Sequence, residues 1–334
     1  MKVSVIINCY NYGGFVGEAI ASALAQTHAH TEVVVVDDGS TDHSRQVIAG
    51  FGARVLPVFK VNGGQGSAYN AGFAVASGEI VVFLDADDWL YREAAARAVA
   101  AFGPGVSKVQ FLLDIVAGDG QPQGRRLPRE MNDRNALALL TRFGTYGTPP
   151  GSGNAYAATF LRQVLPMDEP PWHTAADSVP ILLAPSHGQV VSLHEALGAY
   201  RVHKKAGLET LLFNNEPQGL WPEYERIQRC KTLVATHLQS RGQPFRQPML
   251  LAPWEARVLA LCLRFGGPSK QALPASRLQM MKLALESVWR WPSIGAAMRT
   301  VQSGWMICIW LLPLALARRV GRVDRALKGA AGGG

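Results

Sequence analysis

Short apolar runs alternate with helical spacing along the first hundred residues. Four runs are apolar on both faces, which is typical of strands buried in a parallel sheet. These runs are Val3–Ile7, Glu32–Val36, Arg54–Phe59 and Ile80–Leu84. Helical spacing follows each of them, at Phe15–Ala25, Ser44–Phe51, Ser67–Ala76 and Arg92–Ala101. This alternation predicts βαβ units, so we expect an α/β fold with a mainly parallel sheet flanked by helices.

The pattern changes in the rest of the chain. From about residue 104 to residue 150 the pattern is less regular, and Pro128–Glu130 and Thr148–Gly153 are expected to be loop. Two helices are then expected, at Ala155–Val164 and Asp177–Ala184, followed by two strands at Gln189–Leu193 and Gly198–His203. Three longer helices are expected after them, at Trp221–Leu238, Pro253–Phe265 and Arg277–Trp289. The sequence therefore predicts an α/β domain over residues 1–205 and a mostly helical region over residues 206–334.

Three of the predicted strands end in polar clusters. The clusters are Asn8–Asn11, Asp37–Asp42 and Asp85–Asp88. Neighbouring parallel strands bring such ends to one edge of a sheet, where open α/β sheets bind ligands. In an extended segment Asp85 and Asp87 point to the same side, so their oxygens could hold a divalent cation and a diphosphate. The alternative is an acidic turn in which Asp87 or Asp88 caps the next helix.

Composition and charge narrow the class of protein. A hydrophobic content of 48% with 17% charged residues excludes a disordered chain. Four scattered cysteines indicate reduced thiols rather than disulfides or a zinc site. Residues 1–4 lead directly into the first predicted strand, so no signal peptide is expected. Residues 1–200 hold 13 Lys and Arg against 18 Asp and Glu, whereas residues 201–334 hold 20 against 7. The basic half is expected to meet an anionic partner such as phosphate or lipid headgroups.

In their order and spacing, these motifs resemble family 2 glycosyltransferases. The resemblance covers about residues 1–205 and rests on Val3–Asn11, Val35–Asp42, Gly66–Gly72, Ala76–Glu79 and Asp85–Asp88. It implies a GT-A (Rossmann-like) fold with a helical C-terminal extension, a nucleotide-sugar donor, and Mg²⁺ or Mn²⁺ as cofactor. It also implies that residues 1–103 bind the nucleotide and that residues 104–205 form the acceptor side.

The resemblance also implies roles for individual residues. Tyr10 would lie against the nucleobase, Asp38 would accept a hydrogen bond from uracil if the nucleotide is UDP, and Asp85 would lie near the ribose. Asp87 would bind the metal with Asp88 close by. Asn11 and Asn70 lie in matching motifs and are expected to bind the nucleotide sugar.

One departure concerns a cation. Tyr69 stands where many relatives carry an arginine that neutralises phosphate, so another cation must serve here. Tyr200-Arg201-Val202-His203 is similar to a family segment that closes over the diphosphate. Arg201 and His203 are therefore expected to bind the nucleotide sugar, with Lys204 and Lys205 as further candidates. The alternative for His203 is a surface histidine after a strand.

Transfer needs a base that takes a proton from the acceptor hydroxyl. Asp177 occupies the family's acidic position before an apolar helix, and Asp168 and Glu169 are the reserves. The alternative for Asp177 is an N-cap. The family implies a single displacement that inverts the anomeric centre, and Gly151–Asn154 is expected to shape the acceptor pocket.

The composition of the C-terminal region predicts a membrane-binding surface. Gly304–Ala317 has no charge and is followed by several arginines, yet it is shorter than the roughly 20 residues that span a bilayer. Trp305 and Trp310 with adjacent cations favour an interfacial segment over residues 304–328 on an anionic membrane. The alternative is a helix buried against the enzyme.

Together, these features predict a metal-dependent inverting glycosyltransferase of the cytoplasm, peripheral on the inner face of the plasma membrane. Its expected acceptor is a glycan or lipid-linked hydroxyl in bacterial surface polysaccharide synthesis, and no nucleic acid partner is expected. Two alternatives stay open: a donor-binding or scaffolding relative with impaired catalysis, and a sugar nucleotidyltransferase. The latter would want basic residues after the first strand, where Asn11–Gly14 has none. A nicotinamide dehydrogenase is disfavoured because Gly14–Gly17 only partly imitates the dinucleotide fingerprint.

Overall fold

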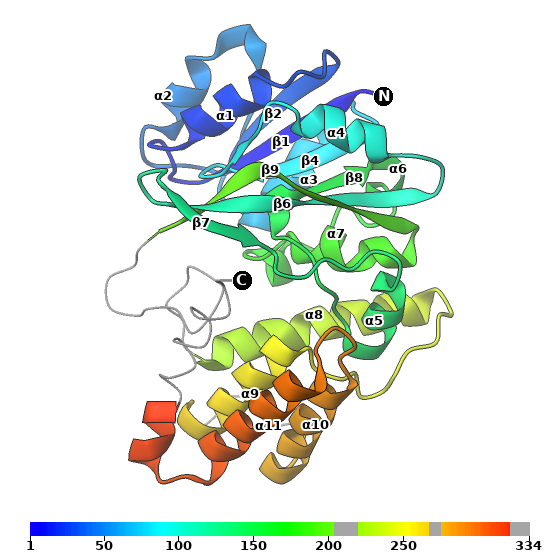
Figure 1. Ribbon diagram of the computed structural model, residues 1–334. Coiled ribbons are helices and arrows are strands. Elements are labelled where there is room, and N and C mark those ends of the chain that lie inside the picture. The colour runs from blue at the N-terminus through cyan, green and yellow to red at the C-terminus, as the bar shows by residue number, and fades with distance from the viewer. Residues whose placement is uncertain (204–219, 267–274, 321–334) are drawn as a thin grey trace. The chain divides into compact units, whose positions relative to one another are not determined.

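The computed structural model describes residues 1–203, 220–266 and 275–320. The chain divides into two compact units (Figure 1). The first consists of Met1–Ala138 and Tyr146–His203, and the second of Leu139–Thr145 and Lys204–Gly334. The expectations for Lys204, Lys205 and residues 321–328 fall outside the described residues.

The sheet of the first unit begins as predicted. Its strand order is β3-β2-β1-β4-β8-β6-β9-β5, with β7 paired to β6. The four strands β3 to β4 in this order are parallel neighbours. Their bounds are β1 Val3–Cys9, β2 Thr31–Asp37, β3 Leu56–Phe59 and β4 Ile80–Asp85. The helices between and after them are α1 Val16–Leu24, α2 Ser44–Ala49, α3 Gln65–Val75 and α4 Ala94–Ala101.

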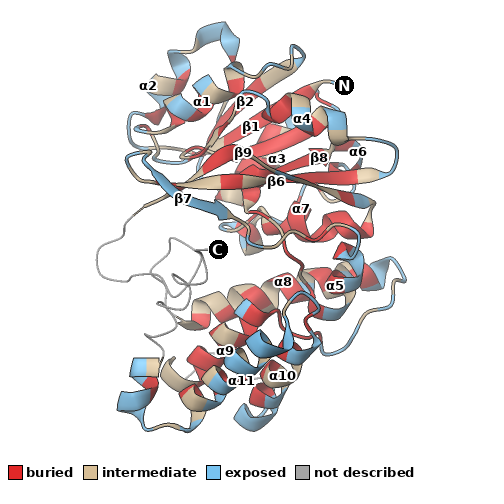
Figure 2. Cartoon of the chain, viewed as in Figure 1, coloured by how far each residue is buried: buried red, intermediate tan, exposed pale blue. Residues whose placement is uncertain are grey.

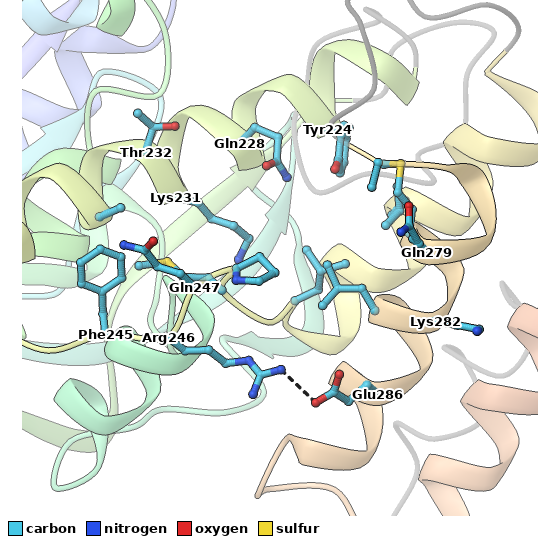
Figure 3. Close-up of a pocket in the computed structure, with 18 residues that line it drawn as sticks. Tyr224, Gln228, Lys231, Thr232, Phe245, Arg246, Gln247, Gln279, Lys282 and Glu286 are labelled. Atoms are coloured by element: carbon cyan, nitrogen blue, oxygen red, sulfur yellow. Dashed lines mark hydrogen bonds and ion pairs between the residues drawn. The ribbon is translucent and has the colours of Figure 1, made fainter.

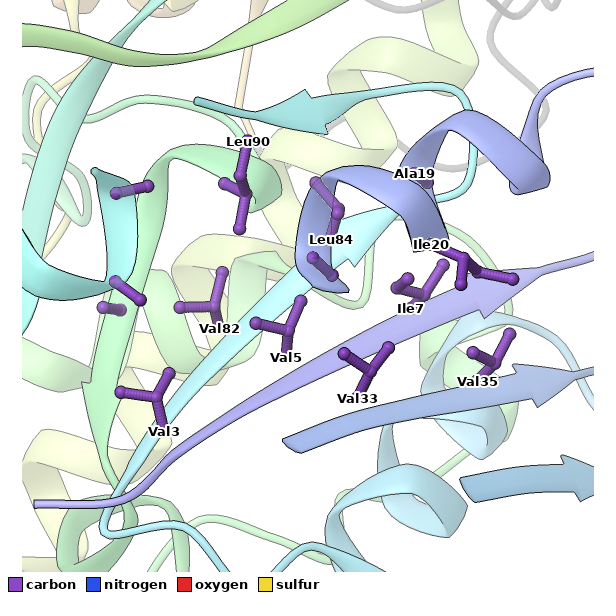
Figure 4. Close-up of a cluster of buried hydrophobic side chains, with 14 of the residues drawn as sticks. Val3, Val5, Ile7, Ala19, Ile20, Val33, Val35, Val82, Leu84 and Leu90 are labelled. Atoms are coloured by element: carbon purple, nitrogen blue, oxygen red, sulfur yellow. The ribbon is translucent and has the colours of Figure 1, made fainter. Parts of the chain in front are cut away.

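Alternate residues of the strands supply the core on each face of the sheet. Val5 and Ile7 lie in one buried cluster with Ile20 of α1 (Figure 4). On the other face α3 approaches closely, because a Cβ at Gly72 would come within 2.4 Å of Ile6. Strands β1, β2 and β4 are buried on both faces (Figure 2), which explains why they appear in the sequence as continuous apolar runs, whereas Leu56 and Phe59 of β3 are exposed.

The second half of the sheet corrects several expectations. Residues 104–150, where the sequence showed no regular pattern, form the long strand β6 Val106–Ala117, β7 Pro122–Leu127 and α5 Ala136–Phe143. The predicted helix at Ala155–Val164 is instead β8 Asn154–Ala157 followed by the short α6 Ala158–Leu161. The two strands predicted between 189 and 203 are one strand, β9 Gln189–Val202, with shifts in its register. The remaining elements are β5 Trp89–Leu90 and α7 Ser178–Leu183.

The sheet is therefore mixed. Strand β8 is antiparallel to both β4 and β6, β5 is antiparallel to β9, and β6 is parallel to β9. The predicted α/β class, the flanking helices and the helical C-terminal extension are confirmed.

The second unit has a core of its own. Its described residues include a helical stretch over residues 314–320 and four further helices. These four are α8 Leu220–Ser240, α9 Pro253–Phe265, α10 Arg277–Arg290 and α11 Ala296–Leu311. The three helices predicted from 221 to 289 are confirmed within two residues. Ile227, Leu259 and Met306 belong to one buried cluster, against which Trp305 packs. Within the described residues, no helix is both long and apolar enough to cross a membrane.

A pocket of about 820 Å³ lies in this helical unit (Figure 3). Its wall combines aromatic and aliphatic side chains such as Tyr224 and Leu283 with the ion pair between Arg246 and Glu286, at 3.0 Å. Lys231 lines it too, but its ammonium group is already bound by Glu255 at 2.8 Å. All lining residues come from the second unit, so the pocket contains none of the residues predicted to do chemistry.

Candidate functional site

The carboxyl ends of β1, β2 and β4 lie level at one edge of the sheet. Asn8 pairs with Asp85 across one side of β1, and Cys9 pairs with Asp37 across the other. The Asn8 amide also donates to Asp85 Oδ1 at 3.0 Å. Since β2 and β4 flank β1 on opposite sides, this edge is a topological switch point, the usual ligand position of an open α/β sheet.

Tyr10 and Asp38 occupy contrasting positions at this edge. Tyr10 is 47% exposed after β1, and its contact with a nucleobase stays a prediction. Asp38 is buried, and its oxygens accept hydrogen bonds from Lys60 Nζ at 2.6 Å and from three groups of residues 62–64 at 2.7–3.1 Å. Asp38 thus fixes the loop after β3, and a uracil that binds here must share its oxygens with that loop.

Two asparagines hold loops together. Asn11 has a φ of +57° and accepts a hydrogen bond from the Thr41 N–H at 2.8 Å, which joins the loops after β1 and β2. Asn70 donates to the Met167 carbonyl and accepts from the Met167 N–H, both at 2.9 Å, and it also donates to Glu169 at 3.2 Å. The chain thus engages both ends of the Asn70 amide, and its contact with the nucleotide sugar stays a prediction. The donor contact of Asn11 stays a prediction.

The acids after β4 separate into different roles. Asp88 is buried, and it accepts hydrogen bonds from Ser152 Oγ at 2.6 Å and from the Arg201 N–H at 2.9 Å. These bonds fix β9 and the turn at Gly151–Gly153, and the role of Asp88 close to the metal stays a prediction. Asp87 remains partly exposed.

At this edge the carboxylates of Asp85, Asp87 and Asp88 lie close to one another, and burial together with their mutual repulsion disfavours the charged forms of Asp85 and Asp88. Burial, and then the charge of Asp87, raise the pKa of Asp85 to about 7. Burial and the charges of Asp87 and Asp85 also raise the pKa of Asp88 well above its usual range. Burial and the same acids raise the pKa of Tyr12 to about 12. A cation bound beside these carboxylates would offset the repulsion between them.

Arg201 is engaged by groups of the protein itself, and its contact with the nucleotide sugar stays a prediction. Its side chain is 4% exposed, and its guanidinium group is surrounded by protein groups. These groups are the Glu18 carboxylate, the carbonyls of Asp87 at 2.9 Å and Gly118 at 2.8 Å, and the rings of Phe15 and Trp89, each 4.9 Å away. Each of the three guanidinium nitrogens binds a protein group, and through these bonds Arg201 holds the end of β9 in place.

Because Arg201 holds the end of β9, His203 lies beside Asp87. His203 Nε2 lies 2.8 Å from Asp87 Oδ2, and both side chains are partly exposed. Within the described ranges, no cluster of three or more His, Cys, Asp or Glu side chains could hold a metal ion by itself. A carboxylate and an imidazole nevertheless suit Mn²⁺, and Mg²⁺ commonly takes one or two carboxylates with substrate phosphates completing the shell. The residues present therefore fit a cation that is held jointly with a diphosphate.

Asp177 lies directly before α7, but its side chain makes no capping hydrogen bond to that helix. Its Oδ2 accepts instead from the Gly151 N–H at 3.2 Å. Gln65 links this segment to the acids: its Oε1 accepts from the Ala176 N–H at 2.9 Å, and its Nε2 lies 3.5 Å from Asp85 Oδ1. The candidate base and the candidate donor side are therefore joined through one glutamine.

Three residues that organise the edge were not singled out from the sequence. Lys60, Gln65 and Ser152 each bind one of the acids through a side chain. Lys60 directly follows a predicted strand and Ser152 stands between two glycines, so their positions gave some signal. Gln65 gave none beyond its place in a glycine-rich stretch.

The fold and the residues at this edge of the sheet define a class of protein. It is an α/β protein whose topological switch point carries carboxylates that suit a nucleotide bound together with a cation. Residues 4–164 match the model of Glycosyl transferase family 2. Residues 4–164 are therefore a glycosyltransferase family 2 domain, and the resemblance inferred from the motifs is confirmed for this part of the chain.

Individual relatives agree with this assignment. An uncharacterized glycosyltransferase of Nostoc sp. (strain PCC 7120) is 41% identical over 214 residues, which are 61% of this chain and 65% of that protein. Glycosyltransferase GlyA of Streptococcus pneumoniae serotype 4 is 36% identical over 121 residues, 35% of this chain and 16% of that protein. The match thus spans less than two thirds of the length of either relative.

Solved structures show the fold. The structure of S. aureus TarS 1–349 in complex with UDP has a TM-score of 0.54 and 18% identity, over 98% of this chain and 92% of that chain. The same protein in complex with UDP-GlcNAc gives a TM-score of 0.52 and 19% identity, over the same shares of the two chains. The predicted GT-A fold is confirmed.

Proposed function

We propose that this protein is a metal-dependent, inverting glycosyltransferase that moves a sugar from a UDP-sugar to a hydroxyl of a glycan or lipid-linked acceptor. The observation that carries the proposal is the meeting of Asp85, Asp87, His203 and Asp177 around one sheet edge. UDP is favoured because TarS, with the same fold, has been crystallised with UDP and UDP-GlcNAc. A place in bacterial surface polysaccharide synthesis is part of the proposal and rests on the resemblance alone.

The residues of the chain divide the work between two sides. Asp87 and His203 would hold Mn²⁺ or Mg²⁺, which when bound supplies positive charge to the leaving diphosphate. Asp177 takes the proton from the acceptor hydroxyl while that oxygen forms a bond to the anomeric carbon. The bond from the anomeric carbon to the diphosphate oxygen breaks at the same time, and the electron pair leaves with UDP. Attack opposite the leaving group inverts the anomeric centre.

A thermal-shift experiment tests donor binding. A ligand that binds only the folded protein raises its melting temperature, by linkage. We expect UDP with Mn²⁺ to raise the melting temperature more than UDP or Mn²⁺ alone, because the cation and the diphosphate complete one another's site. AMP with Mn²⁺ serves as the control. No stabilisation by UDP, UDP-glucose or UDP-GlcNAc with Mn²⁺ would contradict the proposed donor.

We also propose that the C-terminal helices meet an anionic membrane from the cytoplasmic side. One side of α11 is buried through Met306 and Ile309, but Ile307 and Leu311 are exposed. Leu314 and Leu316 are exposed after it, and the exposed Arg318 and Arg319 follow directly. Exposed apolar side chains beside cations match the interface of an anionic leaflet. One face of α11 packs within the helical unit, and the exposed apolar face supports the proposed membrane contact.

Vesicle sedimentation tests this proposal. We expect the protein to sediment with vesicles that contain phosphatidylglycerol and to bind phosphatidylcholine vesicles much less, with binding that weakens as salt screens the charges. Replacing Leu311 and Leu314 by Asp should reduce binding severalfold. Leu137→Asp, at another exposed apolar residue, is the matched control. Equal binding by the double variant and the wild type would contradict the proposed surface.

A further inference from the structure

Gln65, the first residue of α3, is bound at two points to the segment that leads into Asp177. Its N–H donates to the His173 carbonyl at 2.9 Å, and its side-chain Oε1 accepts from the Ala176 N–H at 2.9 Å. The amide nitrogen of the same side chain donates to Asp85 Oδ1 at 3.5 Å. One side chain therefore contacts both the acid on the proposed donor side and the backbone next to the proposed base.

Two glycines allow this segment to approach α3 so closely. Gly64, with a φ of +86°, and Gly66 stand on either side of Gln65. A Cβ at Gly64 would lie 2.2 Å from His173 Nδ1, and a Cβ at Gly66 would lie 2.9 Å from the Trp172 carbonyl oxygen. A side chain at either position would push the segment away. The chain thus keeps Gln65 within hydrogen-bond distance of the segment by leaving both neighbours without side chains.

The backbone of the segment needs such support, because Ala175 has a φ of +57°. Residues other than glycine seldom adopt this conformation, and it persists only where the surroundings maintain it. The N–H that Gln65 accepts belongs to Ala176, the next residue, and the Ser178 N–H then donates to the Ala175 carbonyl at 3.1 Å. Without the bond from Gln65, Ala175 could relax toward an ordinary φ, and this relaxation would move Asp177.

The contact of Gln65 with Asp85 is the weaker of its two side-chain contacts. Asp85 Oδ1 also accepts from the Asn8 amide at 3.0 Å, whereas the Gln65 amide lies 3.5 Å away. Removal of the Gln65 amide therefore leaves Asp85 with its shorter bond, but it takes from the Ala176 N–H an acceptor at 2.9 Å. The larger effect is expected on the side of the base.

We propose that Gln65 is a positioning residue that keeps the backbone of Asp177 in register with Asp85, so that the base meets the acceptor oxygen opposite the leaving diphosphate. The inference rests on the proposed function, in which Asp177 is the base. Gln65 itself takes no proton and needs no contact with either substrate. Misplacing a catalytic group by about 1 Å can cost on the order of a hundredfold in rate, so Gln65 acts on the rate of transfer.

Gln65→Leu tests the inference, because leucine has a similar size but its side chain neither donates nor accepts a hydrogen bond. We expect kcat for UDP release from UDP-glucose or UDP-GlcNAc with Mn²⁺ to fall about tenfold or more, while the KM for the donor stays within about threefold. A kcat within twofold of the wild type, or a KM that rises by more than kcat falls, would overturn the inference.

Gln26→Leu is the matched control. The Gln26 amide also joins backbone groups far away in the sequence, since it donates to the Tyr91 carbonyl at 3.0 Å and accepts from the Ala95 N–H at 2.9 Å. None of these three residues has a proposed role in transfer. We expect both variants to lower the melting temperature by a similar amount, but Gln26→Leu should keep kcat within twofold of the wild type. Equal losses of kcat in the two variants would attribute the effect to stability and overturn the inference.

A double-mutant cycle shows whether Gln65 acts through the base. If it does, Gln65→Leu should cause less than a twofold further loss in the Asp177→Asn background, measured as residual UDP release over hours. An equal loss in both backgrounds would refute the inference and leave the base intact. Full activity of Asp177→Asn alone would instead refute the proposed base, and the inference with it. The two failures are therefore distinguishable.

Discussion

Asp87→Asn is expected to lower Mn²⁺-dependent UDP release by about 10²–10³-fold, the usual effect of removing one electrostatic contact to a developing charge. Asparagine has nearly the same size but no charge, so it cannot balance a divalent cation. The Asp87 carbonyl that binds Arg201 is part of the backbone and persists in the variant. The melting temperature without metal should therefore change little, while the stabilisation by UDP with Mn²⁺ should disappear.

The matched control is Asp119→Asn. Asp119 is an exposed acid in the turn between β6 and β7, and its carboxylate accepts a hydrogen bond only from the nearby Gln121 N–H among the bonds described. It should retain wild-type activity and wild-type Mn²⁺ dependence. Should Asp87→Asn keep its activity within threefold and its apparent Mn²⁺ affinity unchanged, then the cation is held elsewhere and the assignment of Asp87 is wrong.

Asp177→Asn is expected to reduce kcat for sugar transfer by about 10²–10⁴-fold, the range of general base catalysis. The amide still accepts the hydrogen bond from the Gly151 N–H, so the local fold should persist. It does not take a proton at neutral pH, so the attacking hydroxyl keeps its own. The Kd for UDP with Mn²⁺, measured by titration calorimetry, should stay within twofold, because the donor side is unchanged.

The reserve candidate supplies the comparison for this experiment. Asp168→Asn should leave kcat within twofold if Asp177 is the base. A large loss in Asp168→Asn with little loss in Asp177→Asn would transfer the role to the other aspartate. Glu169 is less suited to the role because it accepts a hydrogen bond from Asn70 at 3.2 Å.

The sequence predicted those elements whose residues are apolar on every buried face. Strands β1, β2 and β4 follow this pattern, and so their polar ends could be placed at one edge. Strand β6 does not, because Lys108 and Gln110 are fully buried within it. Burial lowers the pKa of Lys108 well below its usual range, and its ammonium nitrogen donates to Thr148 at 2.8 Å and to Asn154 at 3.0 Å. Polar residues that are satisfied by distant partners look like loop in a single sequence.

The candidate site shows a similar limit. The residues at the strand ends include acids, amides and cations, but the sequence does not indicate which of them are bound by other groups of the same protein. Arg201, Asn70 and Asp88 have the chemistry of ligand-binding residues, yet each is occupied by protein groups far away in the sequence. Only the positions of Glu18, Met167 and Ser152 decide this, and no local pattern gives those positions.

Residues 139–145 belong to the helical unit although they stand in sequence between two parts of the first unit, and this limits where the chain can be divided. Leu140 and Phe143 are fully buried there, and the ring of Phe143 meets that of Trp291 edge-on, with centroids 4.9 Å apart. The Leu250 N–H also donates to the Arg142 carbonyl at 2.8 Å. A polypeptide cut after His203 would keep every strand of the sheet but strip these side chains of their cover. A fusion of the first unit to another C-terminal region must therefore include the helices of the second unit, or replace the seven residues Leu139–Thr145 with residues that tolerate exposure.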